Sequence, residues 1–385
     1  MTGVHVYERI QDVDRGRWDA LAQEPLTSHA SLAAVEGSRM PGVALRYVVV
    51  HDAGGRWLAG APLASIEIDA AGLTHGLFRA AIGTARLARP RLLHTRLCLC
   101  GLPVSVGTRP ARIAPGASGV EVFRILEREL TLFTHERGAA WSAFKEFGEE
   151  DLPAARAALE GRGYVLAPSE PNCGLELPWR RYEEFLAALR SHYRRAIRLA
   201  ARRLADAGVI VDAVPLAGAY GPELHALYDA VRARATIGLE WLTPEYFHAL
   251  GVAFGADAVL LRFRRGDRTI GWVALLVSGE AVVDLFHGID YSERDAASLY
   301  FNQLAEVVRF SIARRAAHLS LGQSTLVAKT RFGGVPVPLW FAVTHRNAAV
   351  RAMLSAGQRV LFPAPAPIRR RVFAPRDGDR KERAA

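Results

Sequence analysis

The stretch His318-Leu319-Ser320-Leu321-Gly322-Gln323-Ser324 decides the fold, because of the elements that flank it. Upstream, apolar alternation predicts consecutive strands at 259–265, 269–277 and 281–288, followed by a long helix at 296–317. Downstream lies a polar loop with Lys329, Arg331, Phe332 and two glycines. A glycine at the end of a strand permits close backbone approach, so we expect Gln323 and Ser324 to lie at the carboxyl edge of a mixed sheet.

The first half of the chain repeats this order weakly. Residues 47–66 and 259–277 both read as an apolar run, a Gly-containing turn and a second apolar run. Each hairpin precedes a further strand, a long helix (119–137 or 296–317) and a short strand (140–147 or 318–321). This favours two copies of one α/β unit. The alternative is that hairpins and amphipathic helices simply recur.

The length of 385 residues suits two domains. Prolines at 168, 171 and 178 interrupt regular structure, which predicts an N-terminal domain at 1–170 and a C-terminal domain at 171–360. Residues 361–385 begin Pro- and Ala-rich and then turn basic. We expect this tail to be disordered.

Composition narrows the class of protein. The net charge of +10 suits an anionic partner such as a phosphorylated cofactor or RNA, although arginine-rich proteins are also basic for compositional reasons. Cys98, Cys100 and Cys173 read as free buried thiols of a reducing cytoplasm, and no Cys/His cluster has zinc spacing, so no metal is expected. No apolar run of membrane-spanning length and no signal peptide are evident, which predicts a cytoplasmic protein. Dinucleotide and P-loop phosphate motifs are absent in the required context.

An arginine-rich helix is expected within 181–207. Tyr193, Ile197, Ala200 and Leu204 have the spacing of one buried stripe. Arg194, Arg198 and Arg202 recur every fourth residue and lie together on the adjoining face, where their mutual repulsion favours an anionic ligand. Alternatively, this face is solvated and pairs with acids elsewhere in the fold.

The strand end Asp284-Leu285-Phe286-His287-Gly288-Ile289-Asp290 places a histidine between two carboxylates in sequence. Gly288 allows a bulge where the strand peels away. A histidine titrates near neutral pH, so His287 is a candidate base for an attacking ammonium. A lone histidine on a strand is also commonly structural. Lys329 and Arg331 could hold a phosphate or polarise a carbonyl, or belong to an ordinary polar connection.

The second half resembles the GNAT-related acyltransferases of the Fem type, including the BioF-like acetyltransferase domain. The likeness rests on short motifs in a shared order. Those of the second half are 182–189 with 193–198, Phe286-His287-Gly288-Ile289-Asp290, Leu299-Tyr300-Phe301-Asn302, 321–333 and Pro338-Leu339-Trp340. Those of the first half are Ser28-His29-Ala30-Ser31-Leu32 and Phe144-Lys145-Glu146-Phe147. Together they span about 25–360.

The resemblance implies two tandem GNAT-like mixed-sheet domains of the α/β (α+β) class. The first is expected to be degenerate and the second to carry the site. Two departures stand out. The pyrophosphate loop of CoA-using GNAT enzymes is not evident in either half, and the helical arm of some Fem enzymes is shortened to 181–207.

We therefore hypothesise an N-acyltransferase that moves an acyl or aminoacyl group from acyl-CoA, an acyl carrier protein or aminoacyl-tRNA onto an amine, without a tightly bound cofactor. Expected catalytic residues are His287, Lys329 and Tyr300. Expected donor-binding residues are Arg194, Arg198, Arg202, Gln323, Ser324 and Arg331, and the expected acceptor pocket comprises Trp241, Tyr246, Phe286 and Asn302. The alternative is a non-catalytic RNA or anionic-polymer binding protein on a degenerate GNAT fold.

Overall fold

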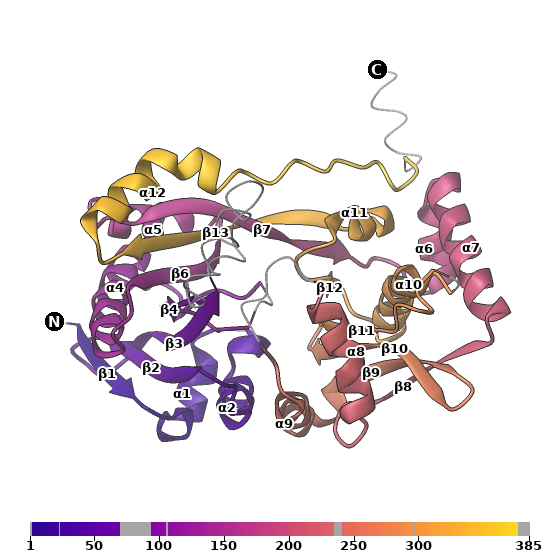
Figure 1. Cartoon of the computed structure of the whole chain (residues 1–385), viewed down its shortest axis with the longest axis horizontal. Coiled ribbons are helices and arrows are strands. Elements are labelled where there is room, and N and C mark those ends of the chain that lie inside the picture. Colours follow the sequence, from indigo (N-terminus) through magenta and orange to yellow (C-terminus); the bar gives the residue numbers. More distant parts are fainter. Residues whose placement is uncertain are drawn as a thin grey trace, which may run out of the picture. The chain divides into compact units, whose positions relative to one another are not determined.

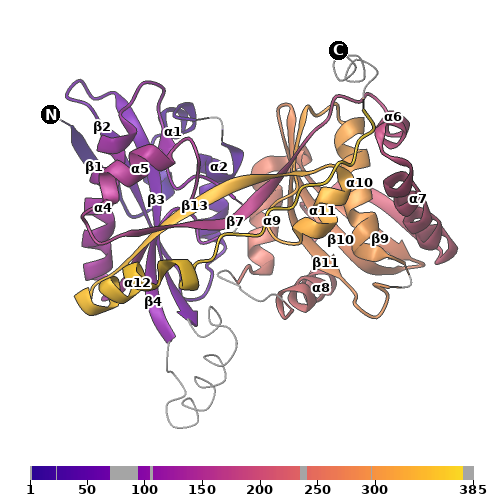
Figure 2. The same ribbon diagram turned by 90° about the horizontal axis from the view of Figure 1, so that it is seen from above.

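The computed structural model describes residues 2–22, 24–69, 94–104, 107–234, 241–295 and 297–375 (Figures 1 and 2). The chain forms two compact units. Unit 1 consists of Met1–Glu170, Ala235–Ala249 and Pro338–Pro365, and unit 2 of Pro171–Arg234, Leu250–Val337 and Ala366–Ala385. Two long strands, β7 (Val165–Glu176) and β13 (Val335–His345), contribute residues to both.

Unit 1 is a mixed sheet with helices. Its principal elements are β1 (Gly3–Tyr7), α1 (Arg15–Ala20), α2 (His29–Gly37), β2 (Ala44–His51), β3 (Trp57–Asp69), β4 (His94–Cys100), β5 (Arg112–Ile113), α4 (Gly119–Glu136), β6 (Trp141–Gly148), α5 (Leu152–Leu159) and α12 (Ala348–Leu361). The strand order is β1-β2-β3-β4-β6-β13-β7. Neighbouring strands are antiparallel at β2–β3 and parallel at β4–β6.

The core of unit 1 lies where α4 packs against the sheet. Ser118 caps this helix by accepting a hydrogen bond from the Glu121 amide. Phe123, Leu126 and Leu130 recur at helical spacing and are buried, which places one apolar face of α4 against the strands. Burial of each such side chain contributes roughly 2 kcal/mol.

Unit 2 repeats the plan. Its elements besides β7 are α6 (Tyr182–Ala188), α7 (Ser191–Asp206), β8 (Val209–Pro215), α8 (Pro222–Arg232), the end of α9 (Pro244–Phe254) from Leu250 onward, β9 (Ala258–Arg265), β10 (Arg268–Ser278), β11 (Ala281–Ile289), α10 (Leu299–Ala313), β12 (His318–Ser320) and α11 (Leu326–Lys329). The strand order is β7-β12-β11-β10-β9-β8. The helices α7 and α10 pack side by side (Figure 2).

The structure confirms the predicted α/β class and the strands of both hairpins, and corrects two helices. The long helix expected at 296–317 spans only Leu299–Ala313. The helix region 181–207 is two helices, because Leu189 and Arg190 are extended and pair with the C-terminal segment. The Arg190 amide donates to the Val372 carbonyl at 2.9 Å, which removes it from the helical ladder.

The linear domain boundaries need correction as well. Residues 338–345 of β13 belong to unit 1, and those from Leu339 to His345 pair with β6, although the sequence division assigned them to the second domain. The tail was expected to be disordered throughout 361–385, and this is wrong for 372–374: Val372 is buried, Phe373 packs on Trp179 at 5.1 Å between ring centroids, and the Ala374 amide donates to the Ala188 carbonyl. The end of that tail, 376–385, lies outside the described residues. Within the described part of the chain, no helix has the length and apolarity to cross a membrane.

Candidate active site

The candidate site begins where two parallel strands of unit 2 part. Residues Ala281–Val283 of β11 pair with His318–Ser320 of β12, and β12 then ends. β11 continues through Asp284–Ile289, and no strand of the described chain pairs with it on that side. The chain leaves β12 through Gly322, which has a φ of 71°. The last pair of residues that the two strands share is Val283 and Ser320. Side chains next to this pair are therefore held by the sheet, and they lie beside the part of β11 that β12 does not cover.

A β-bulge on β11 aims the side chains at this point. Ala274 of β10 pairs with Phe286 and Leu275 pairs with Asp284, so Leu285 is the extra residue. In a regular strand, residues three apart point to opposite faces. The bulge instead brings the Asp284 and His287 side chains together: His287 Nε2 lies 3.1 Å from Asp284 Oδ2 and 3.0 Å from Oδ1.

Gln303 on α10 fixes the histidine ring from the other side. Its side-chain nitrogen donates to the carbonyls of Gly288 (3.0 Å) and Trp272 (3.2 Å). Its oxygen therefore faces His287 Nδ1 at 3.0 Å and accepts a hydrogen bond from the Nδ1–H group. Gln303 is fully buried, and both ring nitrogens of His287 are engaged.

Lys329, the last residue of α11, is only 4% exposed. Its ammonium donates to the Gln323 carbonyl. Burial lowers the Lys329 pKa below its usual value, and the negative charge of Asp284 opposes this shift. A Cβ at Gly322 would lie 3.3 Å from the Asp284 carbonyl and 3.8 Å from Lys329 Nζ, so these three residues meet at the end of β12.

Tyr300 on α10 completes the cluster. Its hydroxyl shares a hydrogen bond with Thr325 Oγ1, and its ring meets His287 edge-on at 5.3 Å between centroids. Burial raises the pKa of Tyr300, so the hydroxyl keeps its proton at neutral pH. The loop that carries Thr325 is strained, because Ser324 and Thr325 both have left-handed φ angles of 61° and 45°.

Cys173 lies beside this cluster on β7. Its side chain is fully buried, and burial raises its pKa to about 11, so it is a neutral thiol. A Cβ on Gly334 would lie 2.5 Å from its sulfur. Glycine at 334 therefore lets the chain that follows α11 pass against β7.

The structure separates the predicted donor-binding residues into two groups. Arg194 donates to the Ala187 and Leu189 carbonyls and so caps the end of α6. Arg198 and Arg202 are exposed, and no arginine of α7 forms an ion pair with any residue that the structure describes. The expected pairing with acids elsewhere in the fold is therefore not found in the described chain. The predicted buried stripe is confirmed at Ile197, Ala200 and Leu204.

The other predicted donor residues flank α11. Gln323 presents its carbonyl to Lys329, and Ser324 is exposed in the strained loop. Arg331 is half-buried and lies over the Phe301 ring at 5.0 Å. Both groups belong to unit 2, but they lie on different elements: Gln323, Ser324 and Arg331 flank α11, and Arg198 and Arg202 lie on α7.

The predicted acceptor-pocket residues do not form one group. Phe286 is buried against the Tyr228 ring at 6.3 Å. Asn302 donates to the carbonyls of Ala200 and Ala297, both at 2.8 Å, and thereby anchors the start of α10 on α7, so we assign it to no pocket. Trp241 is exposed and Tyr246 buried, and both belong to unit 1.

Sequence reasoning missed Asp284 and Gln303 as members of the site. Asp284 stood out only as a carboxylate next to His287 in sequence, and its role depends on a bulge at Leu285 that the prediction placed at Gly288. The one available signal was a carboxylate at an inward position of a strand that is otherwise apolar. Gln303 carried no signal, because glutamine is common on helices.

Unit 1 also has an overhang, but the other strand of its parallel pair makes it: β6 continues past the end of β4 to Gly148. β4 ends at Cys100, which still pairs with Phe144 of β6. The chain that follows is fixed to Lys145, whose ammonium donates to the carbonyls of Leu102 (3.2 Å) and Val104 (2.8 Å). In unit 1 the Lys145 side chain therefore holds the start of the loop after β4 against the continuing strand β6.

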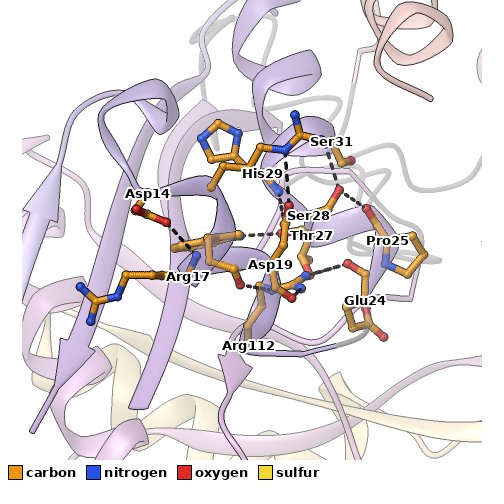
Figure 3. A network of polar contacts seen from close by, with 12 residues as sticks. Asp14, Arg17, Asp19, Glu24, Pro25, Thr27, Ser28, His29, Ser31 and Arg112 are labelled. Carbon is orange, nitrogen blue, oxygen red and sulfur yellow. Dashed lines mark hydrogen bonds and ion pairs between the residues drawn. The ribbon is translucent and has the colours of Figure 1, made fainter. Parts of the chain in front are cut away.

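The Ser28–Leu32 motif of unit 1 belongs to a structural network (Figure 3). Ser28 caps α2 by accepting from the Ser31 amide, and Arg112 is 2% exposed beneath it. The Arg112 guanidinium donates to the carbonyls of Trp18 (3.2 Å) and Glu24 (2.7 Å) and to Thr27 Oγ1 (3.0 Å). Because these partners are mostly backbone, the network fixes the path of residues 18–22 and 24–28.

Comparison with known proteins defines the fold. No protein-family model matches the chain, and no curated protein matches it in sequence. Among solved structures, FemX matches with a TM-score of 0.55 and 12% identity, covering 89% of this chain and 98% of that one. A tandem GNAT protein from the clavulanic acid biosynthesis pathway matches at 0.51 and 13% identity, over 90% and 99% of the two chains.

A third match is the C-terminal domain of a putative lysylphosphatidylglycerol synthetase from Agrobacterium fabrum, with a TM-score of 0.50, 12% identity and coverage of 92% and 98%. At these identities the likeness concerns the fold. The protein has the tandem GNAT fold, in which two mixed α/β units follow each other in one chain, and the fold predicted from its motifs is confirmed.

Proposed function

We propose that unit 2 transfers an activated acyl or aminoacyl group onto an amine and forms an amide. The observation that supports this most directly is the run of β11 past the end of β12, with Asp284, His287, Tyr300 and Lys329 gathered at the point of parting. The tandem GNAT fold adds support, since the matched chain from clavulanic acid biosynthesis is described as a GNAT protein.

The parted strands offer a place for an extended acyl donor. Apart from the Gly288 carbonyl, which already accepts from Gln303, backbone groups of Asp284–Ile289 on this side of β11 can bond a donor as a neighbouring strand would. Holding the donor carbonyl beside the amine makes the reaction effectively unimolecular, which is worth about 7–11 kcal/mol of the barrier when the two are well aligned. Most of the proposed rate enhancement is therefore positional.

Lys329 and Tyr300 would stabilise the charge that develops on the donor carbonyl oxygen. When the amine adds to the carbonyl carbon, the oxygen becomes an oxyanion, and fixed donors in a dry site stabilise it strongly. Lys329 supplies a buried ammonium, and Tyr300 supplies a hydroxyl that burial keeps protonated. Collapse of the adduct forms the amide, breaks the bond to the leaving group and discharges the oxyanion.

Arg198 and Arg202 would bind the anionic part of the donor. Consecutive α-helical residues rise 1.5 Å, so side chains four apart present charges about 6 Å apart along one face. Their lack of acidic partners in the described chain leaves this charge for a ligand. Acyl-CoA, an acyl carrier protein and aminoacyl-tRNA all carry phosphates, and the likeness to a domain of a lysylphosphatidylglycerol synthetase favours an aminoacyl group.

The test is transfer itself. The purified protein is incubated with a panel of acyl-CoAs, charged carrier proteins and aminoacyl-tRNAs together with a mixture of amines, and amide products are identified by mass spectrometry. Lys329→Met should lower the turnover number by about 100- to 1,000-fold, the usual effect of losing one oxyanion donor. Lys145→Met, which removes a buried lysine from unit 1, should leave turnover within a few-fold.

The rival function, a non-catalytic binder of RNA or another anionic polymer, predicts a different result. Such a protein would bind labelled RNA with steep salt dependence, would yield no amide with any donor, and would keep its affinity in the Lys329→Met variant. The absence of product across the whole panel, with binding retained, would reject acyl transfer.

A further inference from the structure

His287 offers no free nitrogen to a substrate. Gln303 presents its oxygen to Nδ1, so Nδ1 carries a proton. Nε2 faces the Asp284 carboxyl, and a bond between them also needs a proton, carried by one or the other. The histidine predicted to be the base therefore holds both nitrogens in hydrogen bonds to the protein.

Asp284 has the acceptor that His287 lacks. Its side chain is 1% exposed. His287 Nε2 lies near both carboxyl oxygens, but the hydrogen bond between the two residues is formed with Oδ2. Oδ1 lies 3.0 Å from Nε2 and has no hydrogen-bond partner. An unpaired buried carboxylate oxygen is costly, by more than the ~1–3 kcal/mol of a neutral group. Such an atom at a candidate site points to a missing donor.

The charges around Asp284 leave room for one more cation or donor. Lys329 is close enough for its ammonium and the carboxylate to attract each other, but its ammonium donates its hydrogen bond to the Gln323 carbonyl. The Tyr300 hydroxyl is bonded to Thr325, and Cys173 is a neutral thiol. None of these groups donates to Oδ1.

We propose that Asp284, with His287 as its positioning residue, binds the acceptor as a primary ammonium and accepts the proton that this ammonium must lose. The catalytic half of this inference rests on the proposed function, and the binding half does not. An N–H bond of the ammonium breaks and its proton passes to Asp284 Oδ1. The freed lone pair forms the C–N bond, and the nitrogen of the adduct then loses its second proton to solvent. Asp284 returns the first proton to the leaving group as the bond between that group and the acyl carbon breaks, which leaves a neutral amide.

The binding half is tested with n-butylammonium chloride as the probe and n-butanol as its neutral match. The ring nitrogens of ¹⁵N-histidine-labelled protein are followed by NMR, and the His287 signals are identified by their loss in His287→Asn. We expect n-butylammonium to shift the His287 Nε2 resonance saturably and n-butanol to leave it unchanged. Absence of a saturable shift in the wild-type protein would overturn the proposal.

Asp284→Asn separates the carboxylate from the fold. An asparagine amide can donate to Nε2 of neutral His287, so the ring keeps both of its bonds. We expect this variant to lose the n-butylammonium shift. Asp290→Asn is the matched control, because Asp290 is the carboxylate on the other side of His287 in sequence and pairs with Arg268. In Asp290→Asn, n-butylammonium should shift the His287 Nε2 resonance as it does in the wild-type protein.

Once a transferred acyl group has been found, the same two variants test catalysis. Asp284→Asn should lower the turnover number by about 100-fold or more, as expected for a lost general base, and Asp290→Asn should not. Normal turnover by Asp284→Asn alongside a defective Lys329→Met would refute the base while leaving acyl transfer intact. A wild-type protein that binds n-butylammonium and transfers nothing would refute the proposed function alone.

Discussion

At the scale of single residues, the candidate site consists of buried polar groups held largely by backbone and by one another. Asp284, Gln303 and Lys329 are each less than a tenth exposed. Burying a polar or charged group lowers the stability of the fold unless hydrogen bonds or opposite charges replace its contacts with water. His287 and Gln303 satisfy one another, whereas Lys329 has a single carbonyl. The lysine is therefore the group whose protonation should respond most to its surroundings.

Lys329 should titrate below its usual value of 10.5, because burial disfavours the ammonium. The sequence has three lysines, so ¹³Cε-lysine NMR gives three signals to follow with pH. Asp284→Asn removes the carboxylate that favours the ammonium, and the Lys329 midpoint should fall further. An unchanged or higher midpoint in that variant would contradict the proximity of these two groups.

The same shift predicts how stability depends on pH. Because the folded-state pKa lies below the unfolded value, the cost of burying the ammonium is fully present below the folded pKa and is relieved as pH rises toward 10.5. Relative to Lys329→Met, the wild type should therefore gain stability across that window. Urea unfolding of both proteins from pH 7 to 10.5 measures the difference.

Gly322 is required both for its backbone and for its space. Its φ of 71° disfavours a side chain, and a Cβ would press on the Asp284 carbonyl at 3.3 Å. We expect Gly322→Ala to lower the free energy of unfolding by about 2 kcal/mol. Gly266→Ala is the control, since Gly266 has a φ of 59° but open space around it, and should cost about 1 kcal/mol. Equal losses in urea unfolding would show that the contact is unimportant.

At the scale of elements, two features of unit 2 set what the site can do. The bulge in β11 converts a sequence separation of three into a side-chain contact between Asp284 and His287. The helix α7 buries one stripe against α10 and leaves arginines on its outer face without acidic partners in the described chain. The first feature creates the polar cluster, and the second provides charge for a large anionic substrate.

Removing two charges from α7 should weaken donor binding. In Arg198→Gln/Arg202→Gln, KM for the donor should rise about tenfold while the turnover number stays within a few-fold. If the donor is a tRNA, the salt dependence of binding should also flatten by about one to two units of slope. Arg124→Gln/Arg128→Gln on α4 removes the same charge at the same spacing from unit 1. An equal rise in KM there would show that net charge alone is responsible.

At the scale of the whole chain, β13 makes the order of the sheet differ from the order of the sequence. It comes after all the other strands in sequence, yet its residues 338–345 lie between β6 and β7 in unit 1. A chain that ends at the predicted boundary therefore lacks an internal strand of its first unit, which leaves two strand edges unpaired.

A fragment of residues 1–170 should consequently fail to fold alone. We expect it to aggregate or to show no cooperative unfolding by circular dichroism. Joining residues 335–365 to it through a long Gly/Ser linker restores the missing strand and should recover a cooperative transition. Cooperative unfolding of the unmodified fragment would show that β13 is dispensable for unit 1.

The sequence alone determined the class of the fold and much of its contents. Strand alternation located β9, β10 and β11, and the 4-3-4 spacing of apolar residues located the buried stripe of α7. The order of short motifs indicated a tandem GNAT fold. These features follow from local periodicity, which shows which side of a helix or strand faces the core. They can therefore be read from the sequence without knowledge of tertiary contacts.

Only the tertiary structure decided which groups meet. The bulge at Leu285 brings the side chains of Asp284 and His287 together, and α10 brings Gln303 to the other ring nitrogen of His287. The strand β13 comes last in the sequence, yet it lies within the sheet of unit 1, between β6 and β7. Strand register, helix docking and the return of a distant strand depend on contacts between residues far apart in the chain. Periodicity within one element carries no information about them, which is why Asn302 was predicted to line a pocket and instead bonds a neighbouring helix.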